Sequence, residues 1–169
     1  MLGNKNILVT GGAGFLGSFL CEKLLAEGAN VICVDSFVTS SEANIDHLLK
    51  QHNFEFIRAD INEPLRFEDY SELARFKISI HGIQEIYHFA CPTSAKRFDQ
   101  LKMQTLLANS VGMRNVCDLA VQYKARIFLA STSVVYGPRP TDGHPFVEHE
   151  LGTFDHLSPR GVYDEGKRW

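Results

Sequence analysis

A glycine-rich loop between an expected strand and an expected helix constrains the fold of this chain more than any other feature. The loop, TGGAGFLG at residues 10–17, follows the apolar run Asn6–Thr10 and leads into Phe15–Ala26, a segment of helical period. Its glycines fit both a G-x-G-x-x-G and a G-x-x-G-x-x-G spacing; they are Gly11, Gly12, Gly14 and Gly17. Such glycines allow a tight turn, the approach of a pyrophosphate to the backbone and close packing of the helix on the strand. The loop therefore predicts a dinucleotide site at the helix N-terminus, where unpaired N–H groups and the helix dipole attract phosphate.

Short apolar runs alternate with segments of helical period along the rest of the chain. The runs expected to form strands are Asn6–Thr10, Val31–Val34, Phe54–Arg58, Glu85–Phe89 and Arg126–Ala130, and the first two are expected to be buried. The segments expected to form helices are Phe15–Ala26, residues 40–51, Phe67–Phe76, residues 98–123 and a last helix that begins near Arg160, after a long loop at Gly137–Pro159. Alternation of this kind implies right-handed crossovers between parallel strands. The predicted fold class is therefore α/β, a doubly wound parallel sheet of the Rossmann type, forming one domain over residues 1–169.

Asp35 ends the second expected strand, about 20 residues after the glycine loop, where dinucleotide-binding folds place an acidic residue. A carboxylate there accepts hydrogen bonds from both hydroxyls of an adenosine ribose and repels a 2′-phosphate. Residues 36–38 (SFV) supply no Arg or Lys that could bind such a phosphate. The sequence therefore predicts NAD rather than NADP.

Tyr163 and Lys167 share one face of the last expected helix, because residues four apart are neighbours on a helix. An ammonium beside a phenol lowers the pKa of that phenol, so this tyrosine is expected to take a proton from an alcohol while hydride leaves for the cofactor. Ser131–Ser133 follow the fifth expected strand, at the sheet edge where doubly wound folds bind ligands. A Tyr and a Lys four apart also arise by chance, and hydroxyls at a strand end also bond the local backbone. The prediction therefore depends on the combination with the glycine loop and Asp35.

Composition excludes several classes of function. With 17 Lys and Arg against 20 Asp and Glu, the net charge of −3 favours neither nucleic acid nor an acidic membrane as partner. No apolar run approaches the roughly 18 residues of a membrane span. The four cysteines form no C-x-x-C pair, which indicates reduced thiols in a cytoplasmic protein. His144, His149 and His156 share one loop without the spacing of a metal site, so no metal is expected.

Taken in order, the motifs resemble those of the extended short-chain dehydrogenase/reductases, NAD-dependent enzymes that modify nucleotide sugars. The stretches that carry the resemblance are TGGAGFLGS (10–18), Asp35, Asp60-Ile61, HFACP (88–92), Asn109, STSVVYG (131–137) and YDEGKR (163–168). Within that family, HFACP, STS and the PR that precedes YDEGKR look most like UDP-glucuronate decarboxylases. The resemblance runs from about Lys5 to the end of the chain.

The resemblance implies roles for individual residues. Tyr163 is implied to be the base, Lys167 its electrostatic partner, and Thr132 the residue that hydrogen-bonds the 4-hydroxyl of the sugar. Asp60 and Ile61 are implied to lie at the adenine. The complete set implied around NAD is Gly11, Gly14, Phe15, Leu16, Gly17, Asp35, Asp60, Ile61, Ala90, Pro92, Asn109, Tyr163 and Lys167.

The implied reaction begins with oxidation of the sugar at C4. In a decarboxylase, a carboxylate at C5 then leaves as carbon dioxide, and bound NADH returns the hydride. Val134 stands where these decarboxylases and the related 4,6-dehydratases carry Glu, and an apolar side chain cannot shuttle a proton. A nucleotide-sugar 4-epimerase can dispense with that acid, so epimerisation is the alternative, and 4,6-dehydration is less favoured. A non-catalytic NAD-binding module is the alternative of a different class.

Members of this family continue beyond the lysine with further strands and a smaller C-terminal domain that grips the nucleotide sugar. The resemblance therefore implies that residues 1–169 are the N-terminal, NAD-binding part, without the substrate domain. Family members commonly dimerise through the helix before the fifth strand and the helix that bears the tyrosine, and the apolar pattern of residues 98–123 permits this. The expected partners are a nucleotide-sugar substrate and a second copy of the chain.

Overall fold

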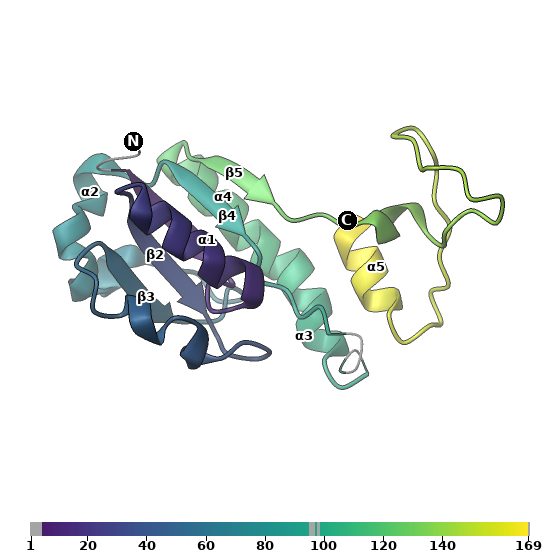
Figure 1. Cartoon of the computed structure of the whole chain (residues 1–169), viewed down its shortest axis with the longest axis horizontal. Helices are drawn as coiled ribbons and strands as arrows, with labels where there is room; N and C mark the ends of the chain where they lie inside the picture. Colours follow the sequence, from purple (N-terminus) through teal and green to yellow (C-terminus); the bar gives the residue numbers. More distant parts are fainter. Residues whose placement is uncertain (1–4, 95–96, 98, 169) are drawn as a thin grey trace.

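Five parallel strands form the centre of the computed structural model, which describes residues 5–94, 97 and 99–168 (Figure 1). The strands are β1 (Asn6–Thr10), β2 (Asn30–Asp35), β3 (Phe54–Arg58), β4 (Glu85–His88) and β5 (Arg126–Leu129). Their order across the sheet is β3-β2-β1-β4-β5, and every neighbouring pair is parallel. The chain runs outward from β1 to β3 and then returns to β4 on the other side of β1. This reversal confirms the doubly wound α/β fold.

Helices cover both faces of the sheet. On one face, α1 (Phe15–Ala26) buries Cys21 and Leu24 in a cluster with the odd-numbered residues of β1 and β2. On the other face, α4 (Met113–Tyr123) buries Val116 in a cluster with the even-numbered residues of the same strands. Because successive side chains of a strand point to opposite faces, β1 is buried along its whole length.

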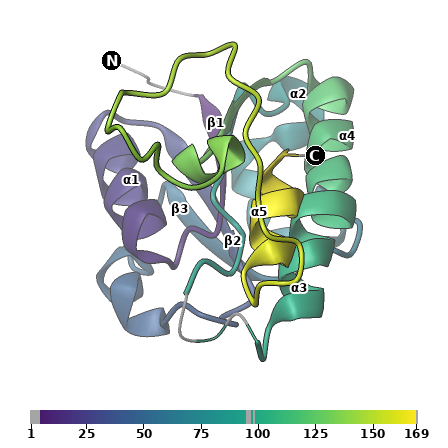
Figure 2. The ribbon, with the colours of Figure 1, turned by 90° about the vertical axis from the view of Figure 1, so that its right-hand side faces the viewer.

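Two further helices stand at the end of the sheet toward which the strands run. α3 (Lys102–Leu107) and α5 (Gly161–Arg168) lie side by side there (Figures 1 and 2). The last expected helix is thus present, and it begins at Gly161. Its position brings the C-terminal part of the chain to the carboxyl edge of the sheet, where doubly wound folds bind their ligands.

Residues 40–51 do not form the single helix expected from their spacing. Two 3₁₀ turns take its place, η1 (Glu42–Asn44) and η2 (Asp46–Leu48). The side chain of Asn44 donates a hydrogen bond to the carbonyl of Ala13 in the glycine loop, at 2.8 Å. A hydrogen bond to a residue distant in sequence thus holds this segment, in place of the backbone hydrogen bonds of a regular helix.

Residues 67–76 also form 3₁₀ structure rather than an α-helix. The two segments are η3 (Phe67–Asp69) and η4 (Ser71–Phe76), followed by the short helix α2 (Ile78–His81). Leu73 and Phe76 are both buried in the core cluster beneath. Residues three apart align in a 3₁₀ helix, so the tighter winding places both side chains on the core.

The helix expected over residues 98–123 begins at Lys102 and is interrupted; residue 98 lies outside the described residues. A π-helical turn, η6 (Ala108–Gly112), joins α3 to α4. At this turn Gly112 packs so tightly on Ile61 that a Cβ would stand 2.6 Å from its Cδ1 atom. π turns inside helices occur frequently at functional sites, and this one contains Asn109.

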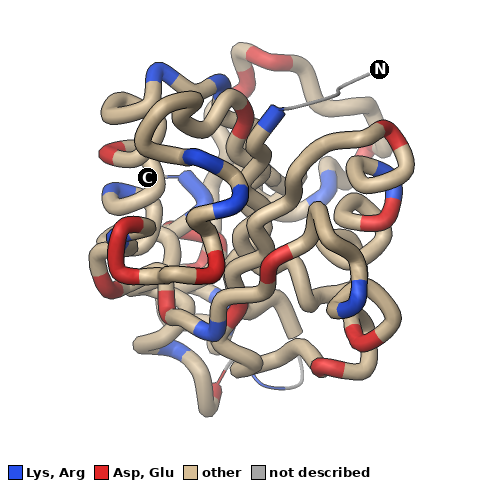
Figure 3. The backbone as a smooth tube through the Cα atoms, turned by 90° about the vertical axis from the view of Figure 1, so that its left-hand side faces the viewer, with Lys and Arg blue, Asp and Glu red and all other residues tan. Residues whose placement is uncertain are grey.

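Charged residues of both signs are interspersed along the chain (Figure 3). Across the described residues, no helix is both long enough and apolar enough to cross a bilayer. The same residues contain no group of three or more His, Cys, Asp or Glu side chains placed to hold a metal ion.

Candidate functional site

The glycine loop forms a close-fitting cradle between β1 and α1. Gly11 has a φ of +71°, and a Cβ there would stand 2.7 Å from the backbone nitrogen of Ala90, so only glycine fits this turn. A Cβ on Gly17 would overlap the carbonyl oxygen of Gly11. Gly14 precedes α1 without a side chain that could cap the helix, and the first turn of α1 contains no acidic residue. The first N–H groups of α1 are therefore available to an anion such as a phosphate.

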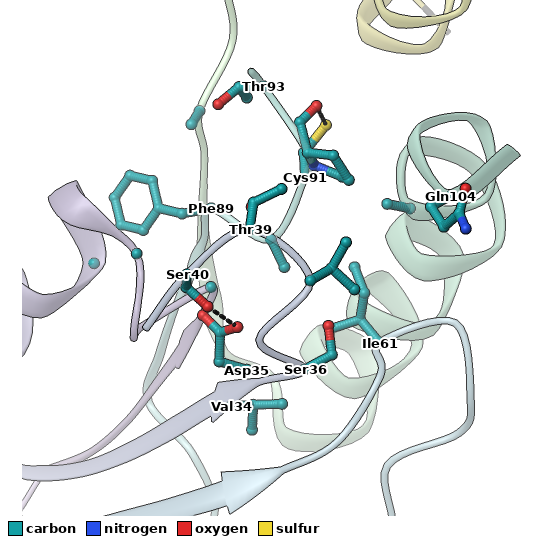
Figure 4. Close-up of a pocket in the computed structure, with 18 of the residues that line it drawn as sticks. Val34, Asp35, Ser36, Thr39, Ser40, Ile61, Phe89, Cys91, Thr93 and Gln104 are labelled. Carbon is teal, nitrogen blue, oxygen red and sulfur yellow. Dashed lines mark hydrogen bonds between the residues drawn. The ribbon is translucent and has the colours of Figure 1, made fainter. Parts of the chain in front are cut away.

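A cavity of about 580 Å³ extends from this loop along the carboxyl ends of the strands (Figure 4). Its size is that of a small-molecule site. The sequence-predicted residues that line it are Gly11, Gly14, Phe15, Leu16, Gly17, Asp35, Asp60, Ile61, Ala90, Pro92, Tyr163 and Lys167. Asn109 lies in a smaller neighbouring cavity beside α5, and Thr132 joins the site through a hydrogen bond to Tyr163. The fold therefore gathers residues from both ends of the chain around one cavity.

Asp35 is buried at the end of β2, and its carboxylate accepts three hydrogen bonds. The Oδ2 atom accepts from the backbone N–H of Ala13, at 3.0 Å. The Oδ1 atom accepts from the backbone N–H of Phe37, at 2.9 Å, and from the hydroxyl of Ser40, at 2.7 Å (Figure 4). A carboxylate has about four lone-pair positions, so one remains for a ligand.

Tyr163 and Lys167 reach the cavity from successive turns of α5. The Nζ atom of Lys167 donates to the carbonyl of Ala130, at 3.0 Å, and burial lowers the pKa of this ammonium. Burial also raises the pKa of the Tyr163 phenol, and a hydrogen bond to Thr132 opposes that rise. The expectation that Lys167 lowers the pKa of Tyr163 stays a prediction for the occupied site. Desolvation disfavours the phenolate more strongly than the neighbouring groups favour it.

His88 is buried at the end of β4, directly beneath the site. Its Nδ1 atom shares a hydrogen bond with the hydroxyl of Thr10, at 2.7 Å. Burial lowers the pKa of this imidazole to about 4, and the charge of Lys167 acts in the same direction. His88 is therefore neutral at physiological pH and adds no positive charge under the cavity.

Asn109 links α5 to the segment that follows β4. Its Nδ2 atom donates to the carbonyl of Thr105, at 2.9 Å, and to the Sγ atom of Cys91, at 3.1 Å. A Cβ on Gly166 would stand 2.9 Å from the Cβ of Asn109, so α5 packs tightly against the π turn. This contact sets the position of the helix that carries Tyr163.

Val134 lies in a 3₁₀ turn, η7 (Ser133–Tyr136), that follows the end of β5. The hydroxyl of Thr132 accepts a hydrogen bond from the N–H of Val134, at 3.4 Å, and so caps this turn. The side chain at position 134 is half-buried and has no group that can exchange a proton.

Sequence reasoning missed the hydroxyl-bearing loop after β2. Ser36, Thr39 and Ser40 line the cavity on the same side as Asp35 (Figure 4). The signal was present, since three hydroxyl side chains follow Asp35 within five residues. Gln104 of α3 also lines the cavity, and it belongs to none of the motifs that the sequence analysis identified.

Comparison with known proteins gives a match over almost the whole chain. The sequence model of the NAD dependent epimerase/dehydratase family matches residues 7–169. UDP-glucuronic acid decarboxylase 1 of Xenopus tropicalis is 40% identical over 164 residues, and UDP-glucuronic acid decarboxylase 4 of Arabidopsis thaliana is 41% identical over 162 residues. These alignments cover 97% and 96% of this chain but 35% and 33% of the relatives. The chain thus spans about a third of the length of the curated relatives it matches.

A solved structure shows the same arrangement of elements. UDP-glucose-4-epimerase from Stenotrophomonas maltophila, crystallised with bound NAD and formylated UDP-arabinopyranose, superposes with a TM-score of 0.70 at 26% identity. The superposition covers 96% of this chain and 45% of that chain. The sequence match over residues 7–169 includes the glycine loop and the carboxyl edge of the sheet.

Proposed function

Because this chain belongs to the NAD dependent epimerase/dehydratase family, we propose that it is the NAD-binding, hydride-transferring part of an enzyme that modifies a nucleotide sugar, most like UDP-glucuronic acid decarboxylase. One observation carries the proposal: a single cavity joins the glycine loop and Asp35 to Tyr163 and Lys167. A phosphate cradle, a ribose acceptor and an acid–base pair are the groups that NAD-dependent oxidation of an alcohol requires.

The residues of the cavity fit NAD. The cradle at Gly11–Gly17 would hold the diphosphate, because Gly11 and Gly17 leave no room for a side chain and the N-terminus of α1 faces the cradle. Asp35 would hold the adenosine ribose, and Asp60 with Ile61 would lie at the adenine. When bound, NAD supplies an acceptor for hydride and, later in the same turnover, a donor.

Tyr163 is the proposed general base. Its Oη atom takes the proton of the sugar 4-hydroxyl during oxidation and returns a proton during reduction. Thr132 hydrogen-bonds Tyr163 and thereby favours the phenolate. Lys167 holds a positive charge at the same cavity, anchored on Ala130. Its field would stabilise the phenolate in the low dielectric of an occupied site.

Two outcomes are open to the oxidised sugar. Identity of about 40% with decarboxylases over almost the whole chain supports loss of a C5 carboxylate as carbon dioxide. Val134 supports the second candidate, a nucleotide-sugar 4-epimerase, because reduction on the opposite face needs no additional acid. An apolar residue at this position disfavours 4,6-dehydration, which requires proton transfer at C5 and C6.

Incubation with NAD and either UDP-glucuronate or UDP-glucose tests the proposal. A decarboxylase releases carbon dioxide from the first, whereas an epimerase converts the second into its 4-epimer. Tyr163→Phe keeps the ring but removes the proton acceptor, so it is expected to lower either rate by at least about 100-fold. If the protein binds NAD but oxidises neither sugar, the chain acts as an NAD-binding module instead.

The proposal extends to a homodimer through α3, α4 and α5. Large apolar side chains of two of these helices are exposed, Met103 and Leu106 on α3 and Val121 on α4. Exposed apolar patches of this kind are typical of protein–protein contacts.

A further inference from the structure

Two cysteine side chains meet beneath the glycine loop, and neither of them lines the cavity. Cys21 belongs to α1, Cys33 belongs to β2, and both are fully buried as free thiols. A Cβ on Gly12 would stand 2.5 Å from the Sγ atom of Cys33 and 3.4 Å from that of Cys21. Both sulfur atoms therefore occupy the space that the missing side chain of Gly12 leaves free.

The two thiols contact each other as well as the loop. A hydrogen bond with Cys21 raises the pKa of the Cys33 thiol, and burial raises it further. Cys33 therefore keeps its proton and does not react while the pair is covered. The loop also rests on β2, because the carbonyl of Val34 accepts a hydrogen bond from the N–H of Gly11, at 2.8 Å. Since α1 packs against β2 (Figure 1), a covalent bond between the two sulfur atoms would join the two elements that support the loop.

The start of α1, next to this pair, is weakly held without a bound anion. Gly14 supplies no side-chain cap, and the first turn of α1 has no acidic residue. The exposed apolar side chains at this end of the helix are Phe15, Leu16 and Phe19. A phosphate at the N-terminus would supply the missing cap. We therefore expect this turn to open more readily without the phosphate, which admits a small oxidant to Cys21 and Cys33.

We propose that Cys21 and Cys33 form a reversible disulfide beneath the glycine loop, and that NAD in the cavity protects the two thiols from oxidation. Hydrogen peroxide is the oxidant. It transfers one oxygen atom to a thiol, which becomes a sulfenic acid, and leaves as water; the second thiol then forms the S–S bond and releases a second water. Two S–H bonds and one O–O bond break, and two electrons pass from sulfur to oxygen. Exchange with a reduced dithiol returns both electrons and restores the thiols.

The disulfide is expected to weaken NAD binding. An S–S bond is about 2.05 Å long, shorter than the separation of two hydrogen-bonded thiols, so α1 must approach β2 when the bond forms. The loop has no room to follow, because Gly17 already packs against the carbonyl of Gly11. By linkage, NAD stabilises the reduced pair by the same factor by which the disulfide weakens NAD binding. The effect of NAD rests on the proposed function, whereas formation of the disulfide does not.

Oxidation with hydrogen peroxide, followed by peptide mapping under non-reducing conditions, tests the pairing. The wild-type chain is expected to yield a cross-linked pair of peptides that contains Cys21 and Cys33 and is separated by dithiothreitol. Saturating NAD is expected to slow formation of this cross-link by at least about tenfold. Isothermal titration is expected to show NAD binding at least about tenfold weaker in the oxidised chain, with full affinity after reduction.

Variants separate this pair from the other cysteines. Cys21→Ala and Cys33→Ala each remove one partner, so both are expected to lose less NAD affinity on peroxide treatment than the wild type does. Cys117→Ala is the matched control, because Cys117 lies on α4, across the sheet from α1; it is expected to form the cross-link as the wild type does. Cys91 lines the cavity and is present in every variant, so its own oxidation affects all of them alike.

The outcomes distinguish the parts of the inference. If peroxide-treated wild-type chain contains no peptide pair that joins Cys21 to Cys33, the inference is overturned, whether or not the variants fold. Unchanged NAD affinity of the oxidised chain, or a cross-link that forms as fast with NAD as without it, would overturn the link to NAD. If the reduced wild-type chain binds no NAD, the proposed function fails, and the peptide map still decides whether the disulfide forms.

Discussion

Tyr163 illustrates how burial and hydrogen bonding compete at a single side chain. Burial raises the pKa of its phenol, and the hydrogen bond from Thr132 is the strongest effect in the opposite direction. The group is therefore protonated at neutral pH in the chain without ligands. Its use as a base depends on neighbours that favour the phenolate.

Substitution of Thr132 tests this dependence. Thr132→Val removes the hydroxyl that lowers the pKa of Tyr163, so the pKa of the base rises and the rate of sugar oxidation reaches its plateau at higher pH. The rate at neutral pH is expected to fall by about 100-fold. Thr132→Ser retains the hydroxyl and is expected to keep the wild-type pH profile. A pH profile of Thr132→Val that coincides with that of the wild type would contradict this account.

His88 provides a prediction about stability. The unfolded chain binds a proton at this imidazole below pH 6.5, whereas the folded chain binds it only below about 4. The free energy of unfolding therefore falls as the pH falls from about 6.5 to about 4, by up to about 3 kcal/mol. His88→Asn has no titrating group and retains a polar partner for Thr10. Urea unfolding measures the free energy of unfolding, which is expected to fall less between about pH 7 and pH 4.5 in this variant than in the wild type. An equal fall in both proteins would mean that a group other than His88 causes the acid sensitivity.

At the scale of elements, the glycine loop and α1 act as one unit that combines a structural with a binding role. Gly17 lets the helix approach the loop, whereas Gly14 stands at the cavity with an ordinary backbone conformation, φ −75° and ψ 173°. We therefore expect Gly17 to serve the packing of the helix and Gly14 to serve the binding of a ligand.

Substitution of each glycine by alanine tests these two roles. Gly17→Ala places a methyl group against the backbone of Gly11 and Gly12 and is expected to cost roughly 3 kcal/mol of folding stability. Gly14→Ala meets only the Gly11 carbonyl, at 3.1 Å, and is expected to change stability by less than about 1 kcal/mol. It is nevertheless expected to weaken NAD binding at least tenfold, because the methyl group takes space beside the phosphate cradle. Thermal unfolding and titration measure both effects, and full NAD affinity in Gly14→Ala would contradict the assignment.

Local pattern predicted the strands and the glycine loop well, because buried parallel strands are continuous apolar runs whose neighbours are already implied by the alternation of elements. It failed where a distant contact decides local structure. Asn44 is held by Ala13, and the π turn at Ala108–Gly112 accommodates Ile61, so neither departure from an α-helix is visible in local spacing. The donor from Ala13 to Asp35 was hidden for the same reason, since Ala13 reaches Asp35 from another element.

At the scale of the whole molecule, β5 is an edge strand without the protection that edge strands usually carry. It is the outermost strand next to β4, and all four of its residues are exposed. Phe128 is 52% exposed and forms an aromatic group with Tyr87 and Phe89, at centroid distances of 5.8 and 5.9 Å. The strand has no proline, and its one charged residue is Arg126. Within the part of the chain that the structure describes, no strand lies beyond β5, and an apolar edge of this kind favours pairing with another strand.

The edge of β5 is thus a second surface for self-association besides α3, α4 and α5, and Phe128→Lys is expected to weaken association through it. Sedimentation velocity over a range of concentrations measures the association. Leu151→Lys is the control, because Leu151 is 95% exposed in the loop after β5 and lies outside the sheet. If Phe128→Lys and Leu151→Lys associate as the wild type does, the edge is not the contact, and the dimer through α3, α4 and α5 becomes the better explanation.

NAD is expected to bind in the cavity between the glycine loop and Tyr163. A crystal structure of the protein grown with NAD shows whether it does. We expect the diphosphate against the N-terminus of α1 at Gly14, the adenosine ribose at Asp35 and the nicotinamide beside Tyr163. NAD bound elsewhere on the molecule, or bound here with its nicotinamide directed away from Tyr163, would overturn the proposed function.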